Sequence, residues 1–252
     1  MNRFIKYLLC LFFIAITVFG YAVPVTILHT NDTHSAYLSQ NSRSGKIGGY
    51  ATLEYYLNAE RAKADRALYL DAGDQQTGSI FSSLAYADAI GGAVIKVFNY
   101  LNLDAATYGN HEFDYSLRNT IKLRELANYP FITSNILDEK NQPFGKMPYQ
   151  IFSLDSLKIG IMGLTLTELP EKVKRENISS LTILPYKEAI DKYLEEVDKQ
   201  SDLIILLTHN GLEADSLLAT VLDNRIDLII GGHSHTVISE PFKVNGIYIA
   251  SA

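Results

Sequence analysis

The stretch Gly109-Asn110-His111-Glu112-Phe113-Asp114 decides how the chain is interpreted, because it joins a strand-to-helix turn to polar side chains suited to a site. It follows a short apolar run, residues 105–108, which is typical of a buried strand. It leads into residues 115–127, whose pattern predicts a helix. The stretch therefore predicts a functional turn. For these six residues alone, a surface turn with incidental polar side chains is the alternative.

Within this turn, His111 and Asp114 are spaced to interact. They lie three residues apart, so both can share one face of the first helical turn. There the carboxylate of Asp114 would fix the tautomer of the His111 ring and raise its basicity. Asn110 adds a neutral carbonyl oxygen as a candidate metal ligand. The turn thus offers an imidazole, its carboxylate partner and a further donor.

Polar residues follow the predicted strands at five separate points along the chain. Because ligands bind beyond the carboxyl ends of strands in α/β sheets, we expect these segments to converge on one rim. Five of the six histidines fall in them. The exception, His29, lies inside the first strand and is expected to be a hydrogen-bonded core residue. The converging residues are Asn31, Asp32 and His34; Asp74; Asn110 and His111; His209 and Asn210; and His233 and His235.

The donor atoms in these segments are nitrogen and oxygen, without sulfur. Such a set suits zinc, manganese, cobalt or iron and does not distinguish among them. There are enough donors for two divalent ions, and the carboxylates of Asp32 and Asp74 would neutralise half of their charge. The remaining charge of about +2 suits a phosphate dianion, and paired metals activate a water for in-line displacement. The sequence contains neither a G-x-S-x-G elbow nor a G-x-x-x-x-G-K-[ST] phosphate loop.

From residue 23 onward, short β-rich runs alternate with helical patterns, which predicts an α/β sandwich. One sizeable core is expected, so residues 23–252 are predicted to form one domain. The expected strands are residues 25–30, 67–70, 105–108, 131–134, 202–208, 227–230 and 247–250, with a hairpin over 149–164. The expected helices are residues 50–64, 85–100, 115–127 and 186–199.

Residues 1–22 have the form of a secretory signal peptide. Arg3 and Lys6 give a basic start, residues 8–20 form an apolar run, and Gly20-Tyr21-Ala22 is a small-x-small cleavage site. The run is short for a membrane span, so no transmembrane segment is expected after cleavage; an uncleaved anchor is the alternative. The sequence therefore predicts an exported protein, periplasmic or extracellular. The single cysteine, Cys10, lies in this segment, which leaves the mature chain without disulfide or thiolate chemistry.

The charge balance argues against a long nucleic-acid partner. The chain has a formal net charge of −6, and two of its basic residues belong to the predicted signal peptide. An acidic protein without a basic run is a poor candidate for gripping a polyphosphate backbone. The expected partner is a small molecule that carries phosphate and is attracted by bound metal ions.

Five ordered segments carry a family resemblance: residues 27–34 (ILHTNDTH), 71–74 (DAGD), 109–114 (GNHEFD), 208–211 (THNG) and 231–235 (GGHSH). They resemble the calcineurin-like metallophosphoesterases, and more narrowly the exported 5′-nucleotidase / UDP-sugar hydrolase family. The resemblance runs from about residue 25 to the end of the chain. It implies a sandwich of two mixed β-sheets flanked by helices. It also implies hydrolysis of nucleoside 5′-monophosphates by a metal-activated water.

The resemblance assigns roles to individual positions of this sequence. It implies one metal ion held by Asp32, His34, Asp74 and His235. It implies a second metal ion, bridged to the first by Asp74, that is held by Asp74, Asn110, His209 and His233. His111, paired with Asp114, is implied as the catalytic histidine that stabilises the transition state and assists the leaving alkoxide.

One departure from the family bears on the substrate. The nucleotidases carry a second, C-terminal domain that binds the nucleoside, and nothing in this sequence corresponds to it. The metallophosphoesterase domain itself is expected to be truncated at its C-terminal end. An inactive metal-binding remnant is therefore one alternative. Another is a hydrolase with the same site and a different ester, namely a 2′,3′-cyclic phosphodiesterase or a sulfur-ester hydrolase; Asn31 and the Glu112-Phe113 pair favour the nucleotidase branch.

Overall fold

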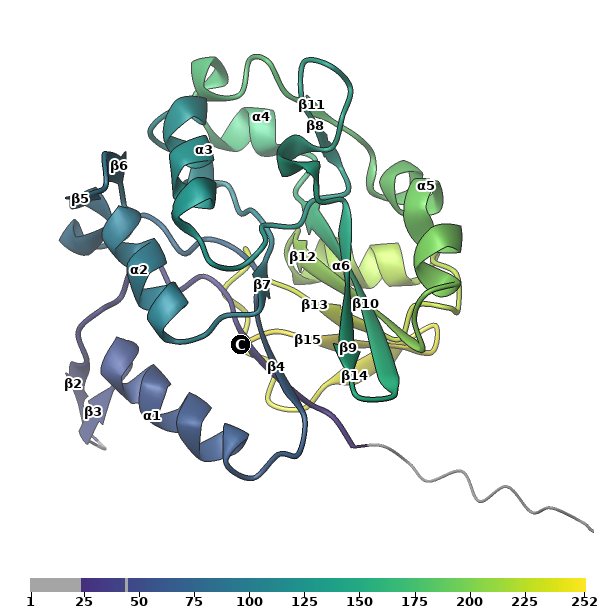
Figure 1. Cartoon of the computed structure of the whole chain (residues 1–252), viewed down its shortest axis with the longest axis horizontal. Coiled ribbons are helices and arrows are strands. Elements are labelled where there is room, and N and C mark those ends of the chain that lie inside the picture. Colours follow the sequence, from purple (N-terminus) through teal and green to yellow (C-terminus); the bar gives the residue numbers. More distant parts are fainter. Residues whose placement is uncertain (1–23, 44) are drawn as a thin grey trace, which may run out of the picture.

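The computed structural model describes residues 24–43 and 45–252, and the predicted signal peptide lies outside this range. Two β-sheets lie against each other in the middle of the molecule, and helices cover the outer side of each (Figure 1). The predicted sandwich is thereby confirmed. Among the described residues, no helix combines the length and the apolar character needed to cross a membrane.

The first sheet has three parallel strands in the order β1-β4-β7. They are β1 (Thr26–Thr30), β4 (Ala67–Asp71) and β7 (Ala105–Ala106). Side chains alternate along β4, so that Leu68 and Leu70 pack toward the second sheet while Tyr69 packs toward the helices. The helices on that side are α1 (Tyr50–Arg61), α2 (Gly92–Tyr100) and α3 (Leu117–Leu126).

The second sheet has six strands in the order β14-β15-β13-β12-β10-β9 and contains both parallel and antiparallel pairs. Both faces of β12 are buried, which explains its run of Leu and Ile. Leu207 faces the first sheet, and Leu206 packs under α5 (Tyr186–Asp198) and α6 (Leu212–Ala219). The strands are β9 (Tyr149–Leu154), β10 (Leu157–Thr165), β12 (Leu203–His209), β13 (Leu228–Ile230), β14 (Phe242–Val244) and β15 (Ile247–Ala250).

Shorter elements lie outside the two sheets. Three pairs of short strands are β2 (Gln40–Ser42) with β3 (Gly45–Ile47), β5 (Ala85–Tyr86) with β6 (Ala89–Ile90), and β8 (Ile136–Leu137) with β11 (Thr182–Ile183). The remaining short helices are α4 (Leu169–Lys172) and the 3₁₀ turns η1 (Ile80–Ser83), η2 (His111–Phe113), η3 (Phe144–Lys146) and η4 (Arg175–Asn177).

Two of the predicted elements are wrong. Residues 85–100 do not form one helix, because β5 and β6 pair as a hairpin and α2 begins only after Gly91, which is left-handed (φ 80°). Residues 131–134 do not form a strand. Instead this segment passes from one sheet to the other: the N–H of Ile132 donates to Ala106 O in the first sheet, and the N–H of Ser134 donates to Gly163 O in the second. A segment that changes sheets cannot keep a strand's ladder.

Candidate metal centre

Six of the seven predicted metal ligands fall into three overlapping groups of donor atoms. Within each group the atoms lie within 4.8 Å of one another. The segments that carry them follow β1, β4 and β13, or end β12 as His209 does. The strand ends of both sheets therefore meet at one site, as the sequence pattern predicts. The groups are, first, Asp32, His34 and His235; second, His34, Asp74 and His111; and third, Asp74, His209 and His233.

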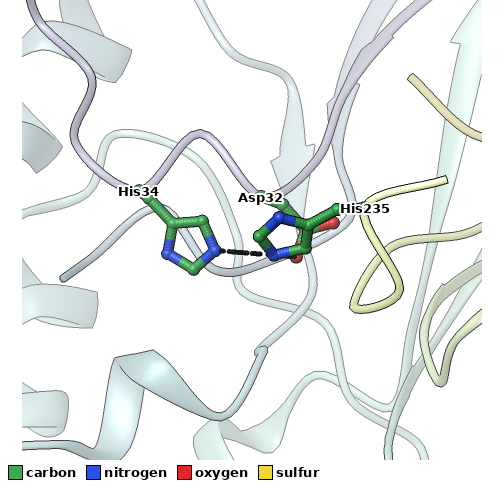
Figure 2. A group of neighbouring side chains, drawn as sticks. All are labelled: Asp32, His34 and His235. Carbon is green, nitrogen blue, oxygen red and sulfur yellow. Dashed lines mark hydrogen bonds and ion pairs between the residues drawn. The ribbon is translucent and has the colours of Figure 1, made fainter. Parts of the chain in front are cut away.

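The first group brings two imidazoles and a carboxylate together (Figure 2). His34 Nε2 is 3.0 Å from His235 Nε2, and Asp32 Oδ1 is 3.6 Å from the same atom of His235. Asp32 is held in place, because its carboxylate accepts the His233 backbone N–H (2.9 Å) and the Asn31 side-chain amide (2.7 Å). The side chain of Asp32 is 3% exposed and that of His235 is 60% exposed, so this group opens to solvent on the His235 side.

The third group contains a buried histidine whose tautomer is fixed by the backbone. His209 Nδ1 lies 2.7 Å from Ala72 O, a carbonyl that can only accept, so this nitrogen carries the proton. Nε2 is therefore the nitrogen whose lone pair a neutral ring would offer to a metal ion, and it lies 3.1 Å from Asp74 Oδ2. Second partners of this kind are what hold a histidine ready as a metal ligand.

Two buried donor atoms of the site are without a hydrogen-bond partner in the described structure. They are His209 Nε2 and Asn110 Oδ1. Asn110 is the seventh predicted ligand, and the N–H of the next residue, His111, donates to Asp74 Oδ1 at 2.8 Å. Buried polar atoms left unpaired are rare in native proteins. A cation would satisfy both, so the residues fit a divalent metal ion.

The electrostatics of the third group also favour a cation. Burial alone would raise the pKa of Asp74, but the rings of His209 and His111 lower it to about 2. Burial opposes a charge on His209, yet Asp74 and Asp32 raise its pKa to about 9. The two side chains therefore form an ion pair in which the imidazole carries an extra proton. Metal binding would displace that proton, because histidine ligates in its neutral form.

Five of the predicted ligands have backbone conformations that L-residues rarely adopt. Positive φ angles are uncommon outside glycine and concentrate at functional sites, where the surrounding structure holds them. Here they bend the chain sharply after each strand, so that side chains from neighbouring loops point to a common centre. The residues are Asp32 (49°), His34 (45°), Asp74 (57°), His233 (77°) and His235 (51°).

The predicted contact between His111 and Asp114 is present. His111 Nδ1 lies 2.6 Å from Asp114 Oδ2, and this hydrogen bond, only partly opposed by burial, raises the pKa of the imidazole. The two residues belong to the short turn η2 and its end, whereas α3 begins later, at Leu117, after a Ser116 cap. The His111 side chain is 31% exposed, so the ring lies partly open to solvent at the site.

Glu112 holds the loops of the site together, although the sequence analysis noted it only as a sign of the family branch. Its buried carboxylate accepts the backbone N–H of Gly109 at 2.7 Å and that of Asp74 at 3.0 Å. It also accepts the N–H groups of Gln75 and Gln76. Glu112 therefore clamps the loop after β4 to the loop after β7. The available signal was an acidic residue directly beside a site histidine.

Asp215 is a second residue missed from the sequence, because α6 was not predicted. Its carboxylate accepts Thr208 Oγ1 at 2.8 Å and Asn210 Nδ2 at 3.1 Å, the residues on either side of His209. Asn210 was expected at the rim, and its amide is used for this contact. His29 lies outside the three donor groups, as expected, but its buried Nδ1 has no partner in the described structure, contrary to the expected hydrogen bond.

A sequence profile described as calcineurin-like phosphoesterase matches residues 25–237. The chain belongs to this family. Within it, the snake venom 5′-nucleotidase of Crotalus adamanteus is 32% identical over 240 residues, which are 89% of this chain and 39% of the relative. The chain thus spans about two fifths of the length of the curated relatives it matches. The resemblance to the calcineurin-like metallophosphoesterases is confirmed, and within that family the chain is similar to part of known 5′-nucleotidases.

Solved structures agree with this placement. A 5′-nucleotidase precursor from Thermus thermophilus superposes with a TM-score of 0.80 at 26% identity, over 90% of this chain and 48% of that one. A sulfate thiohydrolase, SoxB, from the same species superposes with a TM-score of 0.83 at 20% identity, over 92% of this chain and 52% of that one. The second comparison shows the shared fold alone.

Proposed function

We propose that this protein is a dinuclear-metal phosphoester hydrolase that releases phosphate from nucleoside 5′-monophosphates. The observation that carries the proposal is the convergence of nitrogen and oxygen donors from both sheets, two of them buried and unpartnered, beside the His111–Asp114 pair. The similarity to 5′-nucleotidases supports the choice of substrate. One metal ion would be held by Asp32, His34, Asp74 and His235, and the other by Asp74, Asn110, His209 and His233.

Some residues of the site hold the loops that carry the metal ligands, and one residue, His111, transfers a proton. Two divalent ions, when bound, supply an activated water and neutralise the phosphate oxygens. Asp74 and Glu112 fix the two loops that present the donors, through the N–H of His111 and four further backbone N–H groups. His111, held at Nδ1 by Asp114, presents its other nitrogen to the leaving oxygen and donates a proton there.

Export belongs to the same proposal. A basic start, an apolar run and a small-x-small site precede Val23. We infer that residues 1–22 are removed and that the enzyme acts in the periplasm or outside the cell. Mass spectrometry of the protein secreted from its own host, or isolated from the periplasm, should find Val23 as the first residue. A mature chain that still begins at Met1 would show an uncleaved anchor.

The function is tested by turnover of the metal-loaded full chain. With Zn²⁺, Mn²⁺ or Co²⁺ added, the protein should release inorganic phosphate from AMP. His111→Ala should lower kcat by about 10²–10⁴-fold, the usual contribution of a positioned proton donor, while metal content stays unchanged. His29→Gln is the matched control, because His29 lies outside the donor groups, and it should retain turnover.

The choice of substrate is decided in the same assay. AMP, UDP-glucose, a 2′,3′-cyclic nucleotide and a thiosulfate ester should be compared at equal concentration, and AMP should be turned over fastest. Faster turnover of the cyclic nucleotide or the thiosulfate ester would show that the protein is a hydrolase of that ester and not a 5′-nucleotidase. Full metal occupancy without turnover of any ester would identify the protein as a metal-binding remnant. A kcat in His111→Ala equal to that of the wild type would show that His111 takes no part in catalysis.

A further inference from the structure

Thr77 joins the His111–Asp114 pair to the metal ligand His34. Its hydroxyl donates to Asp114 Oδ2 at 2.6 Å, and this oxygen also accepts the Nδ1–H of His111 at 2.6 Å. The Thr77 carbonyl lies 3.2 Å from His34 Nδ1. A carbonyl can only accept, so this contact places the proton of His34 on Nδ1 and leaves Nε2 to the first donor group. One residue thus contacts both halves of the site.

The backbone at Thr77 is bent in a way that is costly for this residue type. Its φ angle is 61°, in the left-handed region, where a β-branched residue is a genuine outlier. The next residue, Gly78, has φ 115° and no room for a Cβ, which would lie 2.7 Å from His34 O. The loop therefore runs tightly along His34. A strained backbone that persists beside a site points to a role for the side chain it presents.

The hydroxyl of Thr77 restrains a torsion that is otherwise soft. The last side-chain torsion of aspartate is broad, so a single hydrogen bond to His111 would leave the Asp114 carboxylate free to rotate. Within the described chain, His111 and Thr77 both donate to Oδ2 of Asp114, from two different loops, whereas Asn177 donates to the backbone carbonyl of Asp114. Thr77 is therefore the second point that fixes the carboxylate plane.

We propose that Thr77 is a positioning residue: its hydroxyl sets the orientation of Asp114, and through Asp114 the direction in which His111 faces the leaving oxygen. This inference rests on the proposed function for its catalytic consequence. The hydrogen bond between Thr77 and Asp114 does not depend on the proposed function and can be tested without measuring turnover. The backbone carbonyl of Thr77 contacts His34, and its side-chain hydroxyl contacts Asp114. Variants of the Thr77 side chain therefore change the orientation of His111 and leave the contact with the metal ligand His34 in place.

Three variants of Thr77 in the full chain test the proposal. Thr77→Val keeps the β-branch and the backbone carbonyl but loses the donor, and kcat for AMP should fall by about tenfold, as for partners of site residues, with KM unchanged. Thr77→Ser restores the donor and should recover most of kcat. Thr77→Gly relieves the left-handed strain, so Tm should hold or rise while kcat falls. Zinc content should stay the same in all three.

A second measurement does not depend on activity. In ¹⁵N-labelled full chain, without metal and with Zn²⁺, the Nδ1–H resonance of His111 should move in Thr77→Val and stay in place in Thr77→Ser. The His34 resonance should be unchanged in both. Thr220→Val is the matched control, because it removes an exposed threonine hydroxyl that donates to Leu217 O, and it should alter neither resonance nor kcat.

Two outcomes would overturn the proposal. One is a Thr77→Val variant with wild-type kcat and an unmoved His111 resonance. The other is equal loss of kcat in Thr77→Val and Thr77→Ser, which would assign the effect to packing. If the wild-type protein hydrolyses no phosphate ester, the proposed function fails, and the movement of the His111 resonance still decides whether Thr77 positions the pair.

Discussion

At the scale of single residues, the buried carboxyl group of Asp215 supports the site but lowers the stability of the folded protein at neutral pH. Burial raises its pKa to about 7, against the opposing hydrogen bonds from Thr208 and Asn210. The folded protein therefore keeps a proton that the unfolded chain loses near pH 4. Since the folded state binds more protons in this range, the free energy of unfolding falls as pH rises from about 4 to about 7.

Asp215→Asn should remove this pH dependence. The amide is neutral at every pH and can still bond Thr208 and Asn210. Relative to wild type, its free energy of unfolding should be similar near pH 4 and higher by about 2–4 kcal/mol at pH 8, because the pKa of Asp215 is about 7 in the folded protein and about 4 in the unfolded chain. Urea denaturation of chelator-treated protein across this range measures the difference. Asp65→Asn, at an exposed position, is the control, and its free energy of unfolding should vary with pH as in the wild type. If the free energy of unfolding of Asp215→Asn falls with pH as steeply as that of the wild type, Asp215 is not the source of this pH dependence.

The metal-ligand candidates were predictable because each lies at the end of a strand or a few residues after it in the sequence. Asp74, for example, comes three residues after the end of β4. His111 and Asp114 were predictable as a pair because only one turn separates them. Thr77 was not, since its partner Asp114 is 37 residues away and the contact exists only once two loops are folded together. Sequence spacing predicts contacts between residues close in the chain, but it does not predict contacts between loops that are far apart in the sequence.

At the scale of elements, strands with strong local patterns were predicted well. The continuous Leu and Ile run of β12 and the alternating hairpin of β9 and β10 appear within one or two residues of their expected ends. Residues 131–134 have an equally apolar pattern, but their partners change from one sheet to the other within three residues. Which partner a short segment finds is decided by the packing of the two sheets, and its own sequence does not record that choice.

Gly163 in β10 lies directly against the segment that passes between the two sheets. A Cβ there would overlap the carbonyl oxygen of Ile132 and lie 3.0 Å from Thr107 Oγ1. Gly163→Ala should therefore destabilise the protein by about 1–3 kcal/mol, the usual cost of adding atoms to a packed core. Thermal unfolding measures the effect, with Ser153→Ala on the exposed side of β9 as the control. Unchanged stability in Gly163→Ala would show that the segment around Ile132 can move aside without cost.

At the scale of the whole molecule, the candidate metal centre ties the first half of the chain to the second. Asp32, His34 and Asp74 follow strands of the first sheet, whereas His209, His233 and His235 belong to the second. The sheets otherwise meet through an apolar layer that includes Leu70, Ile161 and Leu207. Metal ions at this seam would add bonds across it, so their binding should stabilise both sheets together.

Chelation of metal should therefore lower stability globally and abolish turnover. A ligand that binds only the folded state adds about 2.7 kcal/mol at a free concentration of 100 times its Kd, so Tm should rise with the logarithm of added Zn²⁺ or Mn²⁺. Hydrogen exchange should slow in β4 of the first sheet and β12 of the second alike, because Asp74 lies in the loop after β4 and His209 ends β12. Asp74→Asn removes the carboxylate shared by two donor groups and should lose most of the Tm rise. A full rise in that variant would place the ions elsewhere, and protection confined to one sheet would show that the centre does not join the two halves.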